Sequence, residues 1–481
     1  MIEGLILTCL LGVTHAQGWS DPVVSINIPA FNNTQRKDLV VTDGDHVHQI
    51  WYPYQNDPRI GYNVVLPDGT ELLPDTMISR DVSSGYPSMS DASGTAVIGF
   101  WRESTPIWYS TRDHDGNMLL PPTMYTSEPW LMWPTVDSDV DSLNRVHMVW
   151  NIADGSVCYT VLEPGIGEIF RDTIPNSMQA CLIDVDGPRV HIKFNGSPDQ
   201  LADYIQYDLD GNVAIPTVSL VEYSGNNSNF CSMSHDSDGN EYIFVFESRQ
   251  SEPRRLSLYK VNGSTGEVMI DGLMIYQAPQ GNVSLLDPHI LPTAANSSFY
   301  LMWVEDDTEL VDPRYIKTAV IDTNGSFIEE PYIAYDYTDE DPQQIAKLSA
   351  TTNEDGDVFA HWSAYFPEEE VFYIVLGWFD HNWLGIEDEA ASITPPQISL
   401  ALSSNPFRDF LTIEVTGVSW LTELSVYDIT GRMVRELGPG EGSTFLWDGR
   451  DDDGNELPVG TYVIRAESQG ITSAAKVVKL D

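Results

Sequence analysis

Residues 86–120 contain one full copy of the pattern that decides the fold. They comprise YPSMS (86–90), a turn at DASG (91–94), TAVIGFW (95–101), a short loop, IWYST (107–111), a turn at DHDG (113–116) and MLL (118–120). Short apolar runs between Asp/Gly turns are typical of antiparallel strands in hairpins, because glycine accepts the positive φ that tight turns need. The segment therefore predicts four short consecutive strands.

An aromatic residue closes the second of these strands and marks a repeat along most of the chain. The markers are Trp51, Trp101, Trp150, Phe194, Phe246, Trp303 and Trp362. They recur about every 50 residues, which is the length of a four-stranded propeller blade. The repeat predicts an all-β fold with a seven-bladed β-propeller, in which each marker is buried between blades. Six or eight blades are alternatives, and a row of Ig-like domains is disfavoured because each would need about 100 residues.

The composition excludes several classes of partner. The 481-residue chain has 72 Asp and Glu against 24 Lys and Arg, a net charge of −48. Such a surface repels phosphate backbones and anionic headgroups, so neither nucleic-acid binding nor peripheral membrane binding is expected. With 42% hydrophobic residues, the chain is not a disordered acidic tail either. We interpret the acid excess as a solubility feature, spread over the turns and rim loops of the propeller.

The first residues have the features of a secretory signal peptide. An apolar run at residues 5–13 precedes Thr14, His15 and Ala16, which places a small residue at a cleavage site. A buried first strand is the alternative, because the leading segment lacks Lys and Arg. No other run is long and apolar enough to span a bilayer, so we expect no membrane insertion of the mature chain.

The repeat stops near residue 386 and a second unit follows. Acidic residues and prolines form a linker at 387–396, and alternating Leu411, Ile413 and Val415 are typical of a half-buried strand. The predicted organisation is a signal peptide (1–16), a propeller (17–386), the linker (387–396) and a small all-β unit (397–481).

The motifs of this second unit resemble those of the FlgD-type Ig-like domain and of the related C-terminal sorting domain of the type IX secretion system. The residues that carry the resemblance are Asn405, Pro406, Phe407, Gly431, Arg432, Trp447, Asp448, Gly449, Gly460, Tyr462, Lys476 and Lys479. The resemblance implies that residues 397–481 form a small Ig-like β-sandwich that serves as a C-terminal sorting domain. It further implies an outer-membrane secretion translocon as a partner. It also implies a protein that is secreted or displayed at the cell surface.

The repeat region, over about 30–385, resembles the sialidase-like (BNR-type) propellers. The Ser-x-Asp-x-Gly-x-Thr-Trp box of that family is absent, and Arg59-Ile60 is followed by Gly61 where the family has proline. The resemblance therefore implies a propeller fold, while the residues of a sialidase active site cannot be assigned in this chain.

Charged residues gather in the predicted loops after the aromatic markers. Arg102 follows Trp101 directly, and three other loops end in an acid-Pro-Arg sequence, at Arg59, Arg254 and Arg314. Arginines on one rim would bind a carboxylate or sulfate through bidentate hydrogen bonds, although local salt bridges explain the same pattern. The candidate catalytic acids are Glu103, Glu247 and Glu305, since glycoside hydrolysis needs two carboxylates about 5–9.5 Å apart.

Three histidines form an apparent constellation that the repeat explains. His48, His147 and His191 each lie three residues before a marker. The same position in the other copies is occupied by Ile98, Ile243, Tyr300 and Phe359. Apolar and aromatic equivalents predict core histidines rather than metal ligands or catalytic groups.

Cysteines and acidic turns offer few further ligands. Cys158, Cys181 and Cys231 follow the predicted leader, and at most one disulfide, such as Cys158 with Cys181, can form. Buried thiols are the alternative. Residues 451–454 could hold Ca²⁺, but a solvated turn is the simpler interpretation, since an oxygen cage needs about 6–8 ligands. No other cofactor or metal is expected.

Two hypotheses from different classes follow. The first is a secreted cell-surface propeller that binds an extracellular glycan or protein. The second is a propeller-type glycoside hydrolase or polysaccharide lyase that acts on extracellular polysaccharide. A purely structural surface protein is a third. No nucleophile elbow, metal-binding His pair or phosphate loop occurs in the sequence to favour the enzyme.

Overall fold

The structure is a computed structural model in which the chain forms two units, Met1–Ile386 and Glu387–Asp481. The described residues are 14–30, 36–52, 59–79, 87–92, 96–102, 107–126, 136–152, 154, 156–163, 166–174, 177–196, 200–222, 231–247, 253–279, 283–294, 296–307, 314–336, 345–366, 371–381, 399–402, 407–408, 410–416, 423–428, 432–437, 444–452, 454–468 and 471–480. Strands dominate both units, and no helix in these ranges is long and apolar enough to cross a membrane.

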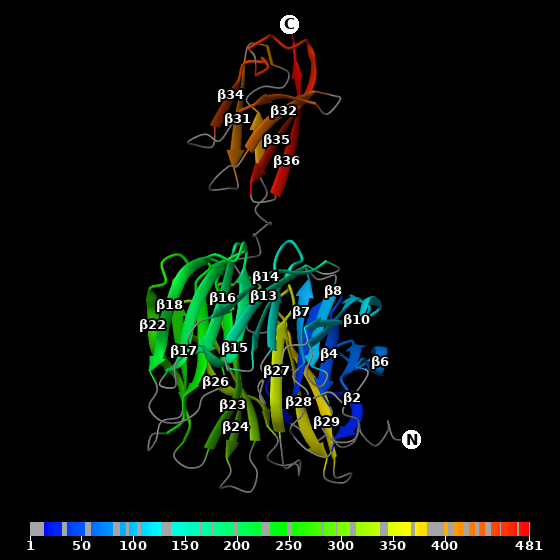
Figure 1. The fold of residues 1–481 in the computed structure, drawn as a ribbon, viewed down its shortest axis with the longest axis vertical. Coiled ribbons are helices and arrows are strands. Elements are labelled where there is room, and N and C mark those ends of the chain that lie inside the picture. The colour runs from blue at the N-terminus through cyan, green and yellow to red at the C-terminus, as the bar shows by residue number, and fades with distance from the viewer. Residues whose placement is uncertain are drawn as a thin grey trace. The chain divides into compact units, whose positions relative to one another are not determined.

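The described part of the first unit contains seven antiparallel sheets, numbered here along the chain (Figure 1). Sheet 1 is β3 (Arg36–Thr42), β4 (His46–Tyr52), β5 (Gly61–Val65) and β6 (Glu71–Met77). Sheet 2 is β7 (Ser88–Ala92), β8 (Ala96–Arg102), β9 (Ile107–Asp113) and β10 (Met118–Thr126). Sheet 3 is β11 (Val136–Val140), β12 (Val146–Asn151), β13 (Val157–Glu163) and β14 (Gly167–Ile174). Sheet 4 is β15 (Met178–Asp186), β16 (Arg189–Asn195), β17 (Gln200–Asp208) and β18 (Val213–Glu222).

The remaining sheets of the unit include strands from the beginning of the chain. Sheet 5 is β19 (Cys231–His235), β20 (Glu241–Glu247), β21 (Arg255–Val261) and β22 (Val268–Gln277). Sheet 6 is β23 (Val283–Pro292), β24 (Ser298–Asp307), β25 (Arg314–Asp322) and β26 (Phe327–Asp336), with β1 (Thr14–His15) added beside β26. Sheet 7 is β27 (Ile345–Thr352), β28 (Val358–Phe366), β29 (Val371–Phe379) and β2 (Val23–Ala30).

The seven sheets close into a ring. The first strand of each sheet contacts the first strand of the next, from β3 through β7, β11, β15, β19 and β23 to β27, and β27 contacts β3 again. The outer strand of sheet 7 is β2, which pairs antiparallel with β29, so the two ends of the unit share one sheet (Figure 1). The predicted all-β propeller is confirmed, and the described sheets number seven.

The connections between strands fall on two faces of the ring. In an antiparallel meander, the links between first and second strands and between third and fourth strands share one end, which we call the turn face. The other links share the opposite end, which we call the loop face. Gly116, in the turn between β9 and β10, has φ +81°, and a Cβ there would lie 2.7 Å from a methyl group of Val64 in sheet 1. Glycine is therefore needed both for the turn and for close packing between the sheets.

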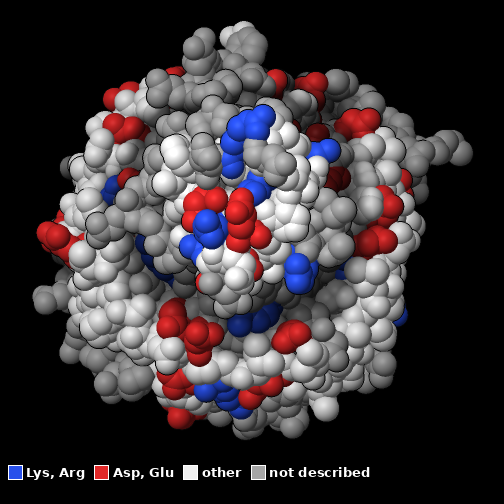
Figure 2. All heavy atoms as spheres, turned by 90° about the horizontal axis from the view of Figure 1, so that it is seen from above, with Lys and Arg blue, Asp and Glu red and all other residues white. Residues whose placement is uncertain are grey.

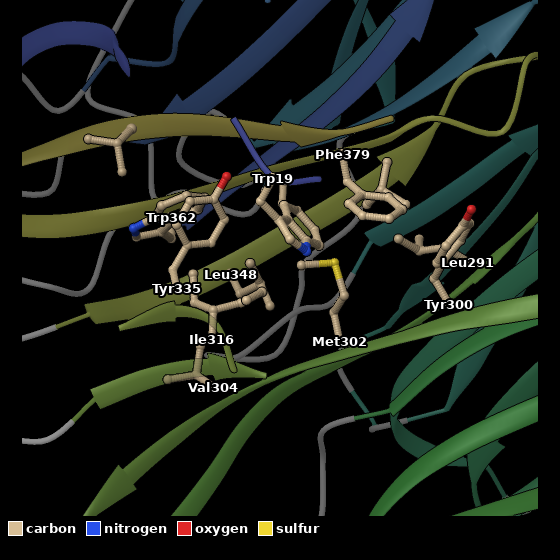
Figure 3. Packing of buried hydrophobic residues seen from close by; sticks show 14 of the residues in the cluster. Trp19, Leu291, Tyr300, Met302, Val304, Ile316, Tyr335, Leu348, Trp362 and Phe379 are labelled. Atoms are coloured by element: carbon tan, nitrogen blue, oxygen red, sulfur yellow. The ribbon is translucent and has the colours of Figure 1, made fainter. Parts of the chain in front are cut away.

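All seven aromatic markers lie on the second strand of a sheet, as predicted. Six of them are buried, from Trp51 to Trp362, while the side chain of Trp101 lies outside the described residues. Trp362 packs against Tyr335 of sheet 6 with ring centroids 4.7 Å apart. Figure 3 shows Trp19 in the middle of this cluster, and its ring centroid lies 5.3 Å from that of Tyr335 and 5.2 Å from that of Phe379. The markers thus fill the spaces between neighbouring sheets.

The start of the chain is tied to the last two sheets. Thr14 and His15 pair with Asp336 and Tyr335 of β26, and Ala16 N donates a hydrogen bond to Ala334 O at 2.9 Å. Residues 1–13, which hold the apolar run of the predicted signal peptide, lie outside the described residues. The signal peptide stays a prediction.

The second unit is a two-sheet sandwich. One sheet is β30 (Ser399–Leu402), β31 (Leu411–Thr416) and β34 (Thr444–Trp447). The other is β33 (Met433–Glu436), β32 (Glu423–Asp428), β35 (Gly460–Ser468) and β36 (Ile471–Lys479). The alternation of Leu411 and Ile413 predicted a half-buried strand, and both side chains lie in the core of the sandwich.

Candidate functional site

Polar side chains near the ring axis join each sheet to the next. The first strand of every sheet has an edge without a strand partner, and its backbone N–H groups need acceptors. Asp38 Oδ2 accepts from Met89 N at 2.8 Å, and Asp137 Oδ2 and Asp139 Oδ2 accept from Ile183 N at 2.9 Å and Val185 N at 2.7 Å. Ser232 Oγ accepts from Ile290 N at 3.1 Å, and Asp287 Oδ2 accepts from Leu348 N at 3.2 Å. Each bond crosses from one sheet to the following one.

Burial changes the protonation of the aspartates that join neighbouring sheets. It raises the pKa of Asp38 to about 6, of Asp139 to about 7 and of Asp137 to about 8, against the hydrogen bonds that these carboxyls accept. Sequence reasoning placed the acidic residues on turns and rim loops, and for these residues that was wrong. The alternation in β11 puts Asp137 and Asp139 on one face, but nothing in the sequence showed that this face points to a neighbouring sheet.

We expect the propeller to lose stability as pH rises from about 6.5 to about 9. Asp137, Asp139 and His235, whose pKa values in the fold are about 8, about 7 and about 9, keep protons that the unfolded chain has released. A folded pKa above the unfolded one stabilises at low pH, and each such proton lowers the free energy of unfolding by about 1.4 kcal/mol per pH unit. Urea denaturation across this range measures the slope.

Two variants separate the axial carboxyls from ordinary surface acids. Asp137→Asn should flatten the slope, because it removes one of the titrating groups. Asp68→Asn should leave the slope unchanged, because Asp68 is exposed and its hydrogen bond with Thr70 lowers its pKa. A wild-type stability that stays constant or rises with pH would contradict the prediction.

The three repeated histidines are core residues. His48, His147 and His191 are fully buried, and each Nδ1 contacts a tyrosine hydroxyl on the third strand of its own sheet, at 2.6, 2.8 and 2.8 Å. Burial lowers the pKa of His48 to about 3 and that of His191 to about 4. This agrees with the packing role that the repeat predicts.

Two of the candidate acids belong to internal ion pairs. Glu247, which is buried, accepts hydrogen bonds from Arg255 Nε at 2.5 Å and Tyr259 Oη at 2.7 Å. Glu305, also buried, accepts a hydrogen bond from Tyr276 Oη of sheet 5 and lies 3.0 Å from Lys317 Nζ. Glu103 lies outside the described residues. Both described carboxylates are thus paired with a cation inside the fold.

The candidate arginines are only partly described. Arg254 Nη1 donates to Val283 O at 2.8 Å and to Ser284 Oγ at 2.6 Å, so it ties the loop face of sheet 5 to sheet 6. Arg59 is exposed on the loop face of sheet 1. The side chains of Arg102 and Arg314 lie outside the described residues. Figure 2 shows acidic side chains in several small groups, some beside basic side chains and some apart from them.

Several residues that carry the resemblance to the sorting domain lie in the core of the second unit. Phe407 pairs with Lys479, and its ring lies 5.2 Å from that of Trp447, which lies 5.3 Å from that of Tyr462. Lys479 is buried and donates to Leu457 O at 2.9 Å, while a Cβ on Gly449 would lie 2.6 Å from Lys479 Cε. By contrast, Arg432, Asp448 and Lys476 are exposed, Gly460 begins β35, and Asn405, Pro406 and Gly431 lie outside the described residues.

The cysteines and the acidic turn have structural explanations. Cys158 is a buried thiol and Cys231 is a half-buried one, which agrees with the alternative of buried thiols, while the side chain of Cys181 lies outside the described residues. Cys158 packs in the core around Trp150. Asp451 Oδ1 accepts a hydrogen bond from Asn455 N at 2.7 Å, which makes the candidate Ca²⁺ loop a hydrogen-bonded turn.

Within the described ranges, one group has metal-ligand spacing that the sequence did not reveal. The ligand atoms of Asp357, Asp380 and His381 lie within 4.8 Å of one another. His381 donates to Asp357 Oδ1 from its backbone N at 3.0 Å, and its Nδ1 lies 2.7 Å from the same oxygen. These bonds tie the end of β29 to the turn between β27 and β28, which explains the group without an ion.

Comparison with known proteins supports the two-part organisation. The family model of the FlgD Ig-like domain matches residues 410–470, which confirms the Ig-like prediction for this segment. No curated protein sequence matches the chain. Solved structures that resemble it include PorZ, an essential bacterial surface component of the type-IX secretion system of Porphyromonas gingivalis. PorZ has 11% identity and a TM-score of 0.30, with 96% of this chain and 70% of PorZ covered.

Two other solved structures also resemble the chain. The SapL1 lectin in complex with alpha methyl fucoside has 9% identity and a TM-score of 0.40, with 62% of this chain and 97% of the lectin covered. The Cps50 (Swd1) β-propeller domain of Myceliophteria thermophila has 10% identity and a TM-score of 0.43, with coverage of 74% and 98%. None of these three is described as a sialidase, and identities this low say nothing about a shared ligand.

Proposed function

We propose that this protein is a secreted, surface-displayed propeller that binds an extracellular glycan or protein through its loop face. In this proposal, the Ig-like unit delivers the chain through an outer-membrane secretion translocon. Support for delivery comes from the FlgD-type match at 410–470 together with the motif residues that extend to Lys479. Support for binding comes from the ring, which holds the loop face on a rigid set of sheets.

The internal pairing of the candidate acids is the observation that favours binding over hydrolysis. A general acid needs a carboxyl that can exchange a proton with substrate, and a nucleophile needs an accessible carboxylate. Glu247 is held by Arg255 and Tyr259, while Glu305 is held by Tyr276 and Lys317. A cation occupies a position beside each carboxylate, and burial keeps substrate away. The enzyme hypothesis thus has no described pair of acids in its favour.

A glycan and protein array with the purified propeller, residues 17–386, tests the binding half. We expect a bound ligand class without turnover. For an anionic ligand, Arg59→Ala should weaken binding by about tenfold or more, because a hydrogen bond to a charged group contributes about 1.5–3 kcal/mol. Arg189→Ala is the matched control, since Arg189 lies at the turn face in an ion pair with Asp186.

The outcomes of the array separate the hypotheses. Binding that survives both substitutions would place the ligand away from Arg59 but keep the binding function. Product release from any polymer would overturn the binding proposal in favour of the hydrolase or lyase. Absence of binding to every glycan and protein on the array would refute both.

A further inference from the structure

A buried group of ionisable side chains joins sheets 4 and 5 near the ring axis. Its centre is Glu241 at the start of β20, Asp184 on β15 and His235 on β19. Glu241 is fully buried, whereas the side chains of Asp184 and His235 are 18% and 22% exposed. The group lies near the turn face, away from the loops proposed to bind a ligand.

The surroundings of Glu241 favour a proton on its carboxyl group. Both carboxyl oxygens are buried and neither has a hydrogen-bond partner, so nothing there stabilises a negative charge. Burial raises the pKa of Glu241, and the neighbouring Asp184 charge adds to this effect. Glu241 is therefore neutral, while Asp184 is ionised.

His235 supplies the cation that keeps Asp184 ionised. Its Nδ1 lies 2.5 Å from Asp184 Oδ2, and its Nε2 lies 4.0 Å from Asp186 Oδ1. Burial opposes the charge on His235, but the Asp184 carboxylate outweighs it and raises the pKa of His235 to about 9. Burial likewise opposes the charge on Asp184, and the His235 charge holds the pKa of Asp184 below its usual value.

The other charged and titratable groups around Glu241 come from four strands. They are Asp139 on β11, Asp186 on β15, Arg189 and His191 on β16, and Tyr204 on β17. His191 Nδ1 lies 3.3 Å from Glu241 Oε2 and 2.8 Å from Tyr204 Oη, and burial keeps His191 neutral. Arg189 Nη1 lies 3.1 Å from Asp186 Oδ2 and donates to Gly239 O. No cation within this set contacts Glu241, so nothing there compensates for a charge on it.

The equivalent histidines of sheets 1 and 3 have partners at both ring nitrogens. His48 Nε2 contacts Thr42 Oγ1 at 3.1 Å and the His114 carbonyl oxygen of sheet 2 at 3.1 Å, and His147 Nε2 contacts Asp141 Oδ2 of its own sheet at 3.2 Å. In sheet 4, His191 Nε2 has no partner, and the acid beside the ring, Glu241, comes from sheet 5. The arrangement at sheets 4 and 5 therefore departs from the repeat.

We propose that Glu241, Asp184 and His235 form a proton-dependent latch between sheets 4 and 5. The latch is closed while Glu241 is neutral and His235 is charged. It opens when these two protons are lost. Because the closed state binds both protons more tightly than the open state, a rise in pH shifts the equilibrium toward opening, by about tenfold per pH unit for each proton released. The contact between sheets 4 and 5 is thus closed in neutral and mildly acidic solution and opens in alkaline solution.

Hydrogen exchange of the full chain tests the latch. The probes are backbone amides of β15 and β19, followed from about pH 7 to about pH 9 and corrected for the intrinsic pH dependence of exchange. In the wild type, opening should increase by more than about tenfold per pH unit. Glu241→Gln should lower this dependence by about tenfold per pH unit, because the Gln side chain is neutral at every pH. An unchanged dependence in this variant would overturn the proposal.

Two further measurements keep the test decisive. Glu247→Gln is the matched control, because Glu247 is a buried acid on the same strand that is paired with Arg255, and it should keep the wild-type pH dependence. The infrared carbonyl band of protonated carboxyl groups near neutral pH should weaken in Glu241→Gln. If that variant does not fold, hydrogen exchange of the wild type still decides, because opening that does not increase with pH would overturn the proposal. A band unchanged by the substitution would refute the neutral state of Glu241.

Discussion

A chain that begins at residue 31 is expected to lose the cooperative unfolding transition of the propeller, whereas a chain that begins at Gln17 keeps it. The missing segment contains β2, the outer strand of sheet 7, and Trp19, which is 4% exposed. It also contains Ser25, whose hydroxyl contacts Gln49 Oε1 of sheet 1 at 3.0 Å. Without these contacts, the last sheet is one strand short and the core between sheets 6 and 7 is open to water. Urea denaturation followed by tryptophan fluorescence and circular dichroism measures the loss.

The matched control removes the other end of the chain. A chain that ends at residue 396 lacks the Ig-like unit but keeps all seven sheets of the ring. We expect its denaturation midpoint to stay close to that of the full chain, while an exporting host should retain it inside the cell. A truncation at residue 31 that unfolds like the full chain would refute closure by β2. Loss of propeller folding in the chain that ends at 396 would refute the independence of the two units.

Replacement of Trp362 by alanine is expected to destabilise the propeller by about 3–5 kcal/mol. The indole is fully buried between sheets 6 and 7, in contact with Tyr335. A Cβ on Gly377 would lie 2.9 Å from its ring, so no space nearby is free to absorb the change. The surrounding β-strands are held by their ladders and cannot collapse into the cavity. The free energy of unfolding from urea denaturation checks the prediction.

An exposed apolar residue provides the comparison for this substitution. Leu119 on the outer strand β10 is 60% exposed, and Leu119→Ala should change the free energy of unfolding by less than about 0.5 kcal/mol. Similar small effects for both substitutions would contradict the burial of the aromatic markers between sheets.

Local patterns in the sequence were sufficient for the repeat. The marker aromatics and the Asp/Gly turns specify strand ends within each copy, because tight turns and buried strand positions depend on residues close together in the chain. The same holds for the Ig-like unit, where Phe407, Trp447 and Lys479 were identified by order and spacing. Their packing into one core explains why these residue types occur together.

Much less of the candidate site could be predicted from the sequence. Arg254 was a candidate for ligand binding, yet its Nη1 is used in bonds to sheet 6. Glu247 and Glu305 were candidate catalytic acids, yet both have internal partners. A charged residue after a strand can bind a ligand or form hydrogen bonds with a neighbouring sheet. The choice depends on contacts between strands far apart in the chain, which a residue pattern does not contain.

The sequence by itself determined the all-β repeat and the buried markers, because both rest on short-range periodicity and turn chemistry, while a family resemblance indicated the Ig-like unit. Only the tertiary structure decided that β2 completes the last sheet, that Asp38, Asp137 and Asp139 join neighbouring sheets, and that Glu241 lies beside His191 of the neighbouring sheet. These features arise where the ring brings together side chains from different copies. Their charge states depend on burial that exists only after the ring has closed.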